Sequence, residues 1–164
     1  MTLKYELKFF DYWHLSSGLS AGAKLDSTVV KDENGLPYAS GKTIKGLVRE
    51  MAEKFGEVDF LHKAYFSNAI LKEDVIKEIT TNKLQDNLYD VIASTKIDKD
   101  GIAEDKSLRE IEVVIPISLY GEIRDIPNDF SERLKKSLKL IKRMGLNRNR
   151  GLGRCEFIIV EEKA

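Results

Sequence analysis

The sequence contains a single cysteine, Cys155, and only two histidines, His14 and His62. One cysteine excludes an internal disulfide and a metal cluster held by several thiolates. No Ser-His or Cys-His pair is evident, which disfavours conventional histidine-based hydrolysis. No apolar run approaches the roughly 18 residues that a membrane-spanning helix needs. The first residues also lack the apolar core of a secretory signal, so we expect a cytoplasmic protein without membrane contact.

A complete phosphate-binding P-loop is absent as well. Ser40-Gly41-Lys42-Thr43 resembles the last residues of that motif, but Leu36 stands where its first glycine is required. The preceding residues form a charged turn, whereas a P-loop follows a buried strand. These departures exclude nucleotide hydrolysis by a P-loop.

Net charge is also lacking, because 27 basic residues balance 27 acidic ones. Proteins that grip nucleic acid by charge alone are usually basic, so the balance counts against a free-standing non-specific binder. The charges are unevenly placed, however. Basic residues are dense from Arg133 to Arg154 with no acid between them, and acids concentrate from Glu73 to Asp105. One face can therefore be basic, or the chain can share binding with other subunits of an assembly.

The apolar pattern predicts both strands and helices. Apolar residues alternate over residues 3–10 and 111–119, which is typical of half-buried strands, and Pro116 interrupts the second run. Ser40 begins an amphipathic helix that ends at Gly56. Further elements are expected as follows: a strand over 64–71, one or two helical turns over 73–79, a helix from Asp129 or Ser131 to Gly145, and a closing strand over 154–161.

The order of these elements is strand–helix–strand followed by strand–helix–strand. This is the split βαβ arrangement of α+β ferredoxin-like and RNA-recognition (RRM-like) domains, with two helices on one face of an antiparallel sheet. We expect one domain over residues 1–164. Residues 14–38 are expected to form a loop with a tight turn at 34–37, and Asp98-Lys-Asp-Gly101 also has turn chemistry.

Two basic segments with glycines suggest a phosphate-bearing partner. At the helix start, Gly41 allows close backbone approach, and Lys42 and Lys45 can add to free N–H groups. An ordinary capped helix with solvated lysines explains that segment equally well. Residues 145–154 carry three glycines and three arginines, which can make bidentate phosphate contacts or stack on bases. A helix cap with incidental arginines explains this second composition less well, so nucleic acid is the leading partner.

Asp26 is an isolated carboxylate in a polar segment. An exposed aspartate titrates near 4, so it is a poor proton donor at neutral pH. It can hold a divalent cation or orient a ribose hydroxyl, but from the residues alone an Asx-turn in a polar loop explains it better. His14, beside Trp13, is expected either to contact RNA or to pack in the core, and His62 receives no role.

Taken in order, several segments resemble the RAMP superfamily (repeat-associated mysterious proteins) of CRISPR systems. The resemblance is strongest to backbone subunits of type III effector complexes and covers nearly the whole chain. Its main segments are Gly22-Ala-Lys-Leu-Asp26 with the following residues to Asp32, Gly35-Leu-Pro37, Ser40-Gly-Lys-Thr-Ile-Lys-Gly-Leu-Val-Arg49 and Arg150-Gly-Leu-Gly-Arg154. Residues 64–71, 97–103 and 107–110 resemble the family's strand after the first helix, its central insertion and its return strand.

The resemblance implies a ferredoxin-like palm that assembles with other RAMP subunits along a guide RNA paired with target RNA. A thumb insertion is implied at about residues 85–107. Asp26 matches the family's catalytic aspartate for cleavage of target RNA with a divalent metal such as Mg²⁺, by attack of a ribose 2′-hydroxyl on its own phosphate. The expected RNA-binding residues are His14, Ser40, Gly41, Lys42, Thr43, Lys45, Arg49, Arg148, Arg150, Gly151, Gly153 and Arg154.

Some features depart from the family pattern. The chain is short, and Ala39-Ser40-Gly41 stands where the family often has Pro-Gly-Ser-Ser. Residues 13–18 and the turn at 35–38 also resemble type III-D subunits that act structurally. Three alternatives stay open: a purely structural RAMP subunit, a guide-processing endoribonuclease, which the single domain disfavours, and a ferredoxin-like protein-interaction domain.

Overall fold

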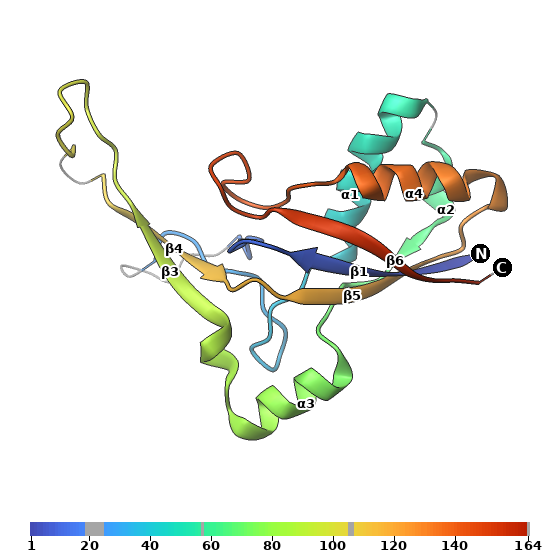
Figure 1. Ribbon diagram of the computed structural model, residues 1–164, viewed down its shortest axis with the longest axis horizontal. Helices are drawn as coiled ribbons and strands as arrows, with labels where there is room; N and C mark the ends of the chain where they lie inside the picture. The colour runs from blue at the N-terminus through green and yellow to red at the C-terminus, as the bar shows by residue number, and fades with distance from the viewer. Residues whose placement is uncertain (19–24, 57, 105–106, 164) are drawn as a thin grey trace.

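The computed structural model describes residues 1–18, 25–56, 58–104 and 107–163. The body is a four-stranded antiparallel sheet in the order β2-β5-β1-β6, formed by Tyr65–Phe66, Ser118–Arg124, Thr2–Phe9 and Cys155–Lys163. Helices α1 (Gly41–Ala52) and α4 (Ser131–Leu140) lie on one face of this sheet (Figure 1). This is the α+β ferredoxin-like arrangement that the sequence predicts.

The central strand β1 carries the core of the sheet. It pairs antiparallel with β5 on one side and with β6 on the other. Its alternate side chains Leu3, Tyr5, Leu7 and Phe9 are buried. Burying each such side chain contributes roughly 1.5–3 kcal/mol relative to leaving it in water, so the predicted alternation is confirmed and explains why this strand is central.

Helix α1 begins where its sequence predicts. The Ser40 hydroxyl accepts a hydrogen bond from the N–H of Thr43 at 3.2 Å, which is an N-cap. Ile44 and Val48 are fully buried on its inner face. A 3₁₀ turn, η1 (Glu53–Phe55), follows the helix, and the chain then turns at Gly56 with φ of 117°.

Helix α4 ends at Leu140, so the prediction that it continues to Gly145 is wrong. Ile141 and Met144 are still buried, although the backbone of Ile141 is already extended. The N–H of Met144 donates to the carbonyl of Gly153 at 3.0 Å. The spacing of the apolar residues fits a helix through Met144, but the N–H of Met144 bonds to the segment before β6 and not to the preceding helical turn. A short 3₁₀ turn, η3 (Asn128–Phe130), precedes the helix.

A separate ribbon of two strands projects from the body (Figure 1). It pairs β3 (Tyr89–Ser94) with β4 (Arg109–Val114) in antiparallel register. The run interrupted at Pro116 is thus split between two sheets, since β4 joins the ribbon and β5 joins the body. Near the ribbon's tip the Asp98 carboxylate accepts two backbone N–H bonds and Gly101 has φ of 80°, which confirms the predicted turn.

The remaining elements are short. They are α2 (Phe60–Lys63), α3 (Glu73–Asn82) and the 3₁₀ turn η2 (Gln85–Leu88). Helix α3 lies on the side of the sheet opposite α1 and α4 (Figure 1). The strand expected over 64–71 is reduced to β2 and two single bridges at Ala69 and Ile70. In the parts of the chain that the structure describes, no helix is both long and apolar enough to cross a membrane.

Two glycines of α1 give opposite stability predictions. A methyl group at Gly41 would lie 2.1 Å from the backbone oxygen of Phe66, whereas nothing lies within 4 Å of one at Gly46. Gly46→Ala is expected to raise the free energy of unfolding by about 1 kcal/mol, because alanine is the better helix former. Gly41→Ala is expected to lower it by about 2 kcal/mol through overpacking. Urea unfolding measures both, and equal effects would contradict the close packing at Gly41.

Candidate nucleic-acid interface

Residues 142–154, here called the basic loop, connect α4 to β6. The loop is fixed to the segment that follows β1. The N–H of Leu146 donates to the carbonyl of His14 at 2.9 Å, and the N–H of Gly153 donates to the carbonyl of Tyr12 at 2.8 Å. Because β1 is the central strand, these bonds hold the loop against the body of the domain.

The backbone conformation favours glycine at all three glycine positions of the basic loop. Gly145, Gly151 and Gly153 all have positive φ, which favours glycine. A methyl group at Gly145 would lie 2.3 Å from the backbone oxygen of His14, and one at Gly153 would lie 1.9 Å from that of Met144. Gly151 is exposed with open space around it, so of the two glycines predicted to bind RNA only Gly151 lies at the surface.

The arginines of the basic loop differ in their surroundings. Arg154 contacts the Asp11 carboxylate at 3.3 Å. Arg143 donates to the backbone oxygen of Arg148 at 3.2 Å. Within the described residues, no hydrogen bond or ion pair engages the side chains of Arg148 and Arg150. Their guanidinium groups therefore keep their donors for an external anion.

A cavity of about 340 Å³, here called the Phe10 pocket, opens beside the basic loop. Phe10 itself is 39% exposed, and the guanidinium carbon of Arg154 lies 5.3 Å from its ring centre. The ammonium of Lys8 lies 5.4 Å from the same ring. The pocket is lined by Phe10, Lys142, Arg143, Arg154, Cys155 and Glu156. With Lys8, four cations surround the ring against two carboxylates, Glu156 and the Asp11 that pairs with Arg154, so the surroundings keep a positive surplus.

Cys155 lines this pocket but is not a nucleophile. Burial raises the pKa of its thiol to about 12, although the nearby charge of Lys142 acts in the opposite direction. The thiolate is the reactive form of cysteine. At neutral pH the side chain therefore stays protonated and serves as packing, as the sequence pattern indicates.

The start of α1 is less open to phosphate than its sequence suggests. The N–H of Gly41 donates to the side-chain oxygen of Asn68 at 3.0 Å. The Thr43 N–H is taken by Ser40, and the hydroxyls of these two residues lie 2.9 Å apart. Gly41 is buried, and its lack of a side chain serves the contact with Phe66. A phosphate at this point would have to replace bonds that the fold uses.

Among the basic side chains of α1, Lys45 is engaged by the fold and Lys42 and Arg49 are exposed. The Lys45 ammonium donates to the carbonyl of Ala64 at 2.9 Å, and it lies 5.7 Å from the Phe66 ring centre. Lys42 and Arg49 are exposed. Of the cations predicted on this helix, these two are the ones that face solvent.

Asp26 lies beside the projecting ribbon. Its N–H donates to the carbonyl of Glu110 at 2.9 Å, and its carboxylate accepts the N–H of Glu110 at 2.8 Å. The neighbouring Ser27 pairs in parallel with Ile111 of β4. The side chain of Asp26 is exposed, but one of its oxygens is already engaged by the backbone. Residues 22–24, which carry part of the predicted segment, lie outside the described residues.

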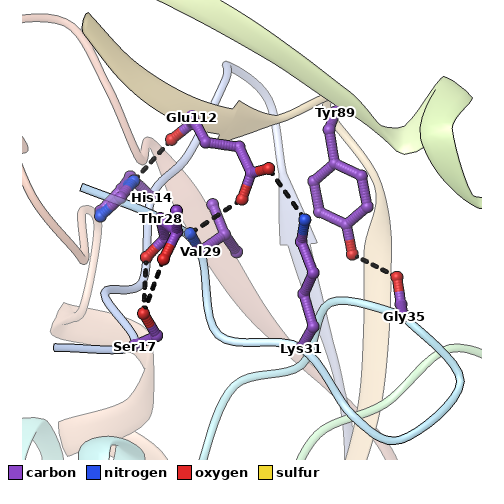
Figure 2. A network of polar contacts seen from close by, with 8 residues as sticks. All are labelled: His14, Ser17, Thr28, Val29, Lys31, Gly35, Tyr89 and Glu112. Atoms are coloured by element: carbon purple, nitrogen blue, oxygen red, sulfur yellow. Dashed lines mark hydrogen bonds and ion pairs between the residues drawn. The ribbon is translucent and has the colours of Figure 1, made fainter. Parts of the chain in front are cut away.

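A polar network centred on Glu112 holds this segment to the ribbon (Figure 2). The Glu112 carboxylate accepts the N–H of Val29 at 3.0 Å and pairs with the Lys31 ammonium at 2.8 Å. That ammonium lies 3.9 Å from the ring centre of Tyr89, whose hydroxyl donates to the carbonyl of Gly35 at 2.7 Å. The side chain of Glu112 is only 12% exposed. The network therefore fixes the segment that carries Asp26 onto both strands of the ribbon.

His14 belongs to the same network and has no exposed surface. Its Nδ1 lies 2.5 Å from the carbonyl of Glu112 and its Nε2 lies 3.0 Å from the hydroxyl of Ser27. The expectation that His14 contacts RNA conflicts with this burial. The packing alternative describes its place in the structure, because a side chain inside the core cannot stack on a base.

The comparisons with known proteins agree with this fold. The family model of the RAMP superfamily matches residues 6–156. The chain belongs to the RAMP superfamily. A chain of Type III-B Cmr-beta bound to cognate target RNA aligns with a TM-score of 0.74 and 12% identity, covering 97% of each chain. A chain of the apo state of Type III-B Cmr-beta aligns with a TM-score of 0.73 and 12% identity, covering 99% of this chain and 98% of that one. No match was found among curated proteins.

In the described part of this RAMP chain, Asp26 does not belong to a group of side chains that could form a metal centre. Within residues 1–18, 25–56, 58–104 and 107–163, no group of three or more His, Cys, Asp or Glu side chains is placed to hold a metal ion. One oxygen of the Asp26 carboxylate is also bound to the N–H of Glu110. The described side chains therefore do not hold an ion by protein groups alone.

The residues predicted from the sequence to bind RNA do not include Phe10, Lys142 and Arg143, which line the Phe10 pocket of this candidate interface. Lys142 and Arg143 stand in the basic run but precede the glycine-containing segment 145–154 on which the prediction rests. Phe10 ends the alternating run of β1, on the charged side shared with Lys8. An aromatic residue on the charged side of a strand is the signal that points to it.

Proposed function

We propose that this RAMP chain is an RNA-binding subunit of a type III CRISPR effector complex. The observation that carries the proposal is the fixed basic loop: within the described residues no hydrogen bond or ion pair engages the side chains of Arg148 and Arg150, and Lys142, Arg143 and Arg154 line the pocket of the exposed Phe10 ring. Membership of the superfamily and the shared fold with chains of Type III-B Cmr-beta support it. Guide RNA, target RNA and other RAMP subunits are the proposed partners, in the cytoplasm.

The physical basis is local charge within a neutral chain. Guanidinium groups bind phosphate in bidentate fashion, and such charge-assisted bonds are the stronger ones in proteins. Because the net charge is zero, the attraction for RNA must come from the basic surface rather than the whole molecule. Each phosphate contact on a single strand contributes about −0.7 to the slope of log affinity against log salt concentration.

A salt titration of RNA binding tests the proposal. The double variant Arg148→Ala/Arg150→Ala is expected to bind single-stranded RNA at least ~10-fold more weakly, with a salt slope about 1.4 units shallower. Lys63→Ala/Lys77→Ala removes the same charge from exposed positions on α2 and α3 and serves as the matched control. Fluorescence anisotropy, on protein expressed with its native neighbours, measures both quantities.

Two results would contradict the proposal. One is equal loss in the two double variants, which would mean that only net charge matters. The other is wild-type protein that neither co-purifies with RNA nor binds it. That result would favour the ferredoxin-like protein-interaction domain.

Cleavage of target RNA through Asp26 with Mg²⁺ is the finer part of the proposal, and a purely structural subunit is its alternative. The hydrogen bond from Glu110 favours the alternative, because it gives the Asp26 carboxylate a role in the fold. Any bound ion would take its other ligands from RNA oxygens and water. The ribbon of β3 and β4 is proposed to be the thumb, and it exposes Ile97 and Ile102 near its tip for a partner to cover.

A further inference from the structure

We propose that the Phe10 pocket holds one unpaired nucleobase of RNA and that Glu156 selects a base that carries an exocyclic amino group. This inference rests on the proposed function, since it names the part of the RNA that the basic surface binds. Its elements are an exposed ring, a cavity of single-nucleotide size, surrounding cations and one acceptor.

The ring of Phe10 is held in place but is not part of the core. The N–H of Phe10 donates to the carbonyl of Arg154 at 2.9 Å, so the backbone of Phe10 is fixed beside another residue that lines the pocket. The side chain is 39% exposed and lies outside the buried hydrophobic cluster. Exposed aromatic rings among cations are the platforms on which proteins stack unpaired bases.

The size of the pocket fits one base. Its volume of about 340 Å³ lies at the lower end of the roughly 300–1,000 Å³ that small-ligand sites occupy. Lys142, Arg143 and Arg154 line the pocket, so the phosphate beside the base meets positive charge.

Glu156 supplies the pocket with a hydrogen-bond acceptor that can distinguish one base from another. It is the only acidic residue that lines the described pocket, and an ionised carboxylate accepts hydrogen bonds but cannot donate them. Lys142 contacts it at 3.8 Å, a loose ion pair that leaves acceptor capacity on the carboxylate. Cytosine presents an N4 amino group to such an acceptor, whereas uracil presents a carbonyl oxygen at the same position. Cytosine and uracil are therefore the matched pair that distinguishes selection from general stacking.

Binding of oligocytidine and oligouridine of equal length tests the inference. Wild-type protein, expressed with its native neighbours, is expected to bind oligocytidine about 10-fold more tightly. Glu156→Gln adds donors beside the acceptor, so the preference should fall to about 2-fold or less while affinity for oligouridine is kept or rises. Phe10→Leu should weaken both oligonucleotides about 10-fold. Phe55→Leu, at another exposed phenylalanine, should change neither.

The outcomes separate this inference from the proposed function. Binding that depends on Arg148 and Arg150 but is unchanged in Phe10→Leu and Glu156→Gln would overturn the inference alone. Equal affinity for the two oligonucleotides in the wild-type protein would overturn the selection by Glu156. Absence of any RNA binding would overturn both proposals. Thermal unfolding of each variant confirms that a loss of binding is not a loss of fold.

Discussion

Replacing Glu112 by alanine is expected to lower the free energy of unfolding by about 2 kcal/mol, because the N–H of the buried Val29 loses its charged acceptor and the partly exposed pair with Lys31 is lost. The carboxylate is largely buried and binds both the N–H of Val29 and the Lys31 ammonium. The variant leaves these donors without their acceptor. It also removes the side-chain contact that holds residues 29–31 against the ribbon (Figure 2).

Two controls make this prediction specific. Glu112→Gln keeps an acceptor for Val29 but loses the charge opposite Lys31, so a loss of about 1 kcal/mol is expected. Glu122→Ala removes an exposed pair with Arg124 at 3.2 Å and should change stability by less than about 1 kcal/mol. Urea unfolding gives the stabilities, and hydrogen exchange at the Val29 amide reports local release. A loss in Glu112→Ala no larger than in Glu122→Ala would contradict the role of the network.

The parts of the fold that the sequence predicts are those governed by local chemistry. The cap at Ser40, the turn at Asp98 and the alternation of β1 depend on neighbours a few residues away. Each of these preferences acts within the segment itself. Together with the other periodic runs they predict the order strand–helix–strand, strand–helix–strand, and that order predicts the ferredoxin-like fold.

The parts that sequence reasoning missed depend on distant partners. Strand β3 shows no buried alternation because the ribbon projects into solvent, and its backbone is held by pairing with β4, a strand about 20 residues further along the chain. Helix α4 stops early because the backbone of Met144 bonds to Gly153. Neither partner can be read from the residues around the element.

The same distinction applies to the candidate site. The basic loop was recognisable because its glycines and arginines stand together in the sequence. The start of α1 looked like a phosphate site because its donors seemed free, but Asn68 and Ala64 occupy them from the segment after the helix. His14 looked available for RNA, yet its partners Ser27 and Glu112 enclose it. A local motif shows which donors exist and leaves open which of them the fold already uses.

In an assembled complex that cleaves target RNA, Asp26→Asn is expected to lower the cleavage rate at least ~100-fold. The substitution is chosen because asparagine keeps a side-chain oxygen for the N–H of Glu110 while removing the negative charge. Stability should therefore stay within about 0.5 kcal/mol of the wild type. Single-turnover cleavage of a labelled target RNA, in Mg²⁺ and with guide RNA bound, measures the rate.

Asp26→Ala separates the chemical role of the carboxylate from its role in the fold. It removes both the charge and the hydrogen bond, so it should lose the same cleavage and in addition about 1 kcal/mol of stability. If alanine impairs cleavage and asparagine does not, Asp26 acts by holding its segment against Glu110. If neither impairs cleavage, the nuclease proposal fails and the purely structural subunit is the better description. Only a rate that follows the charge, with the bond to Glu110 intact, assigns the chemistry to Asp26.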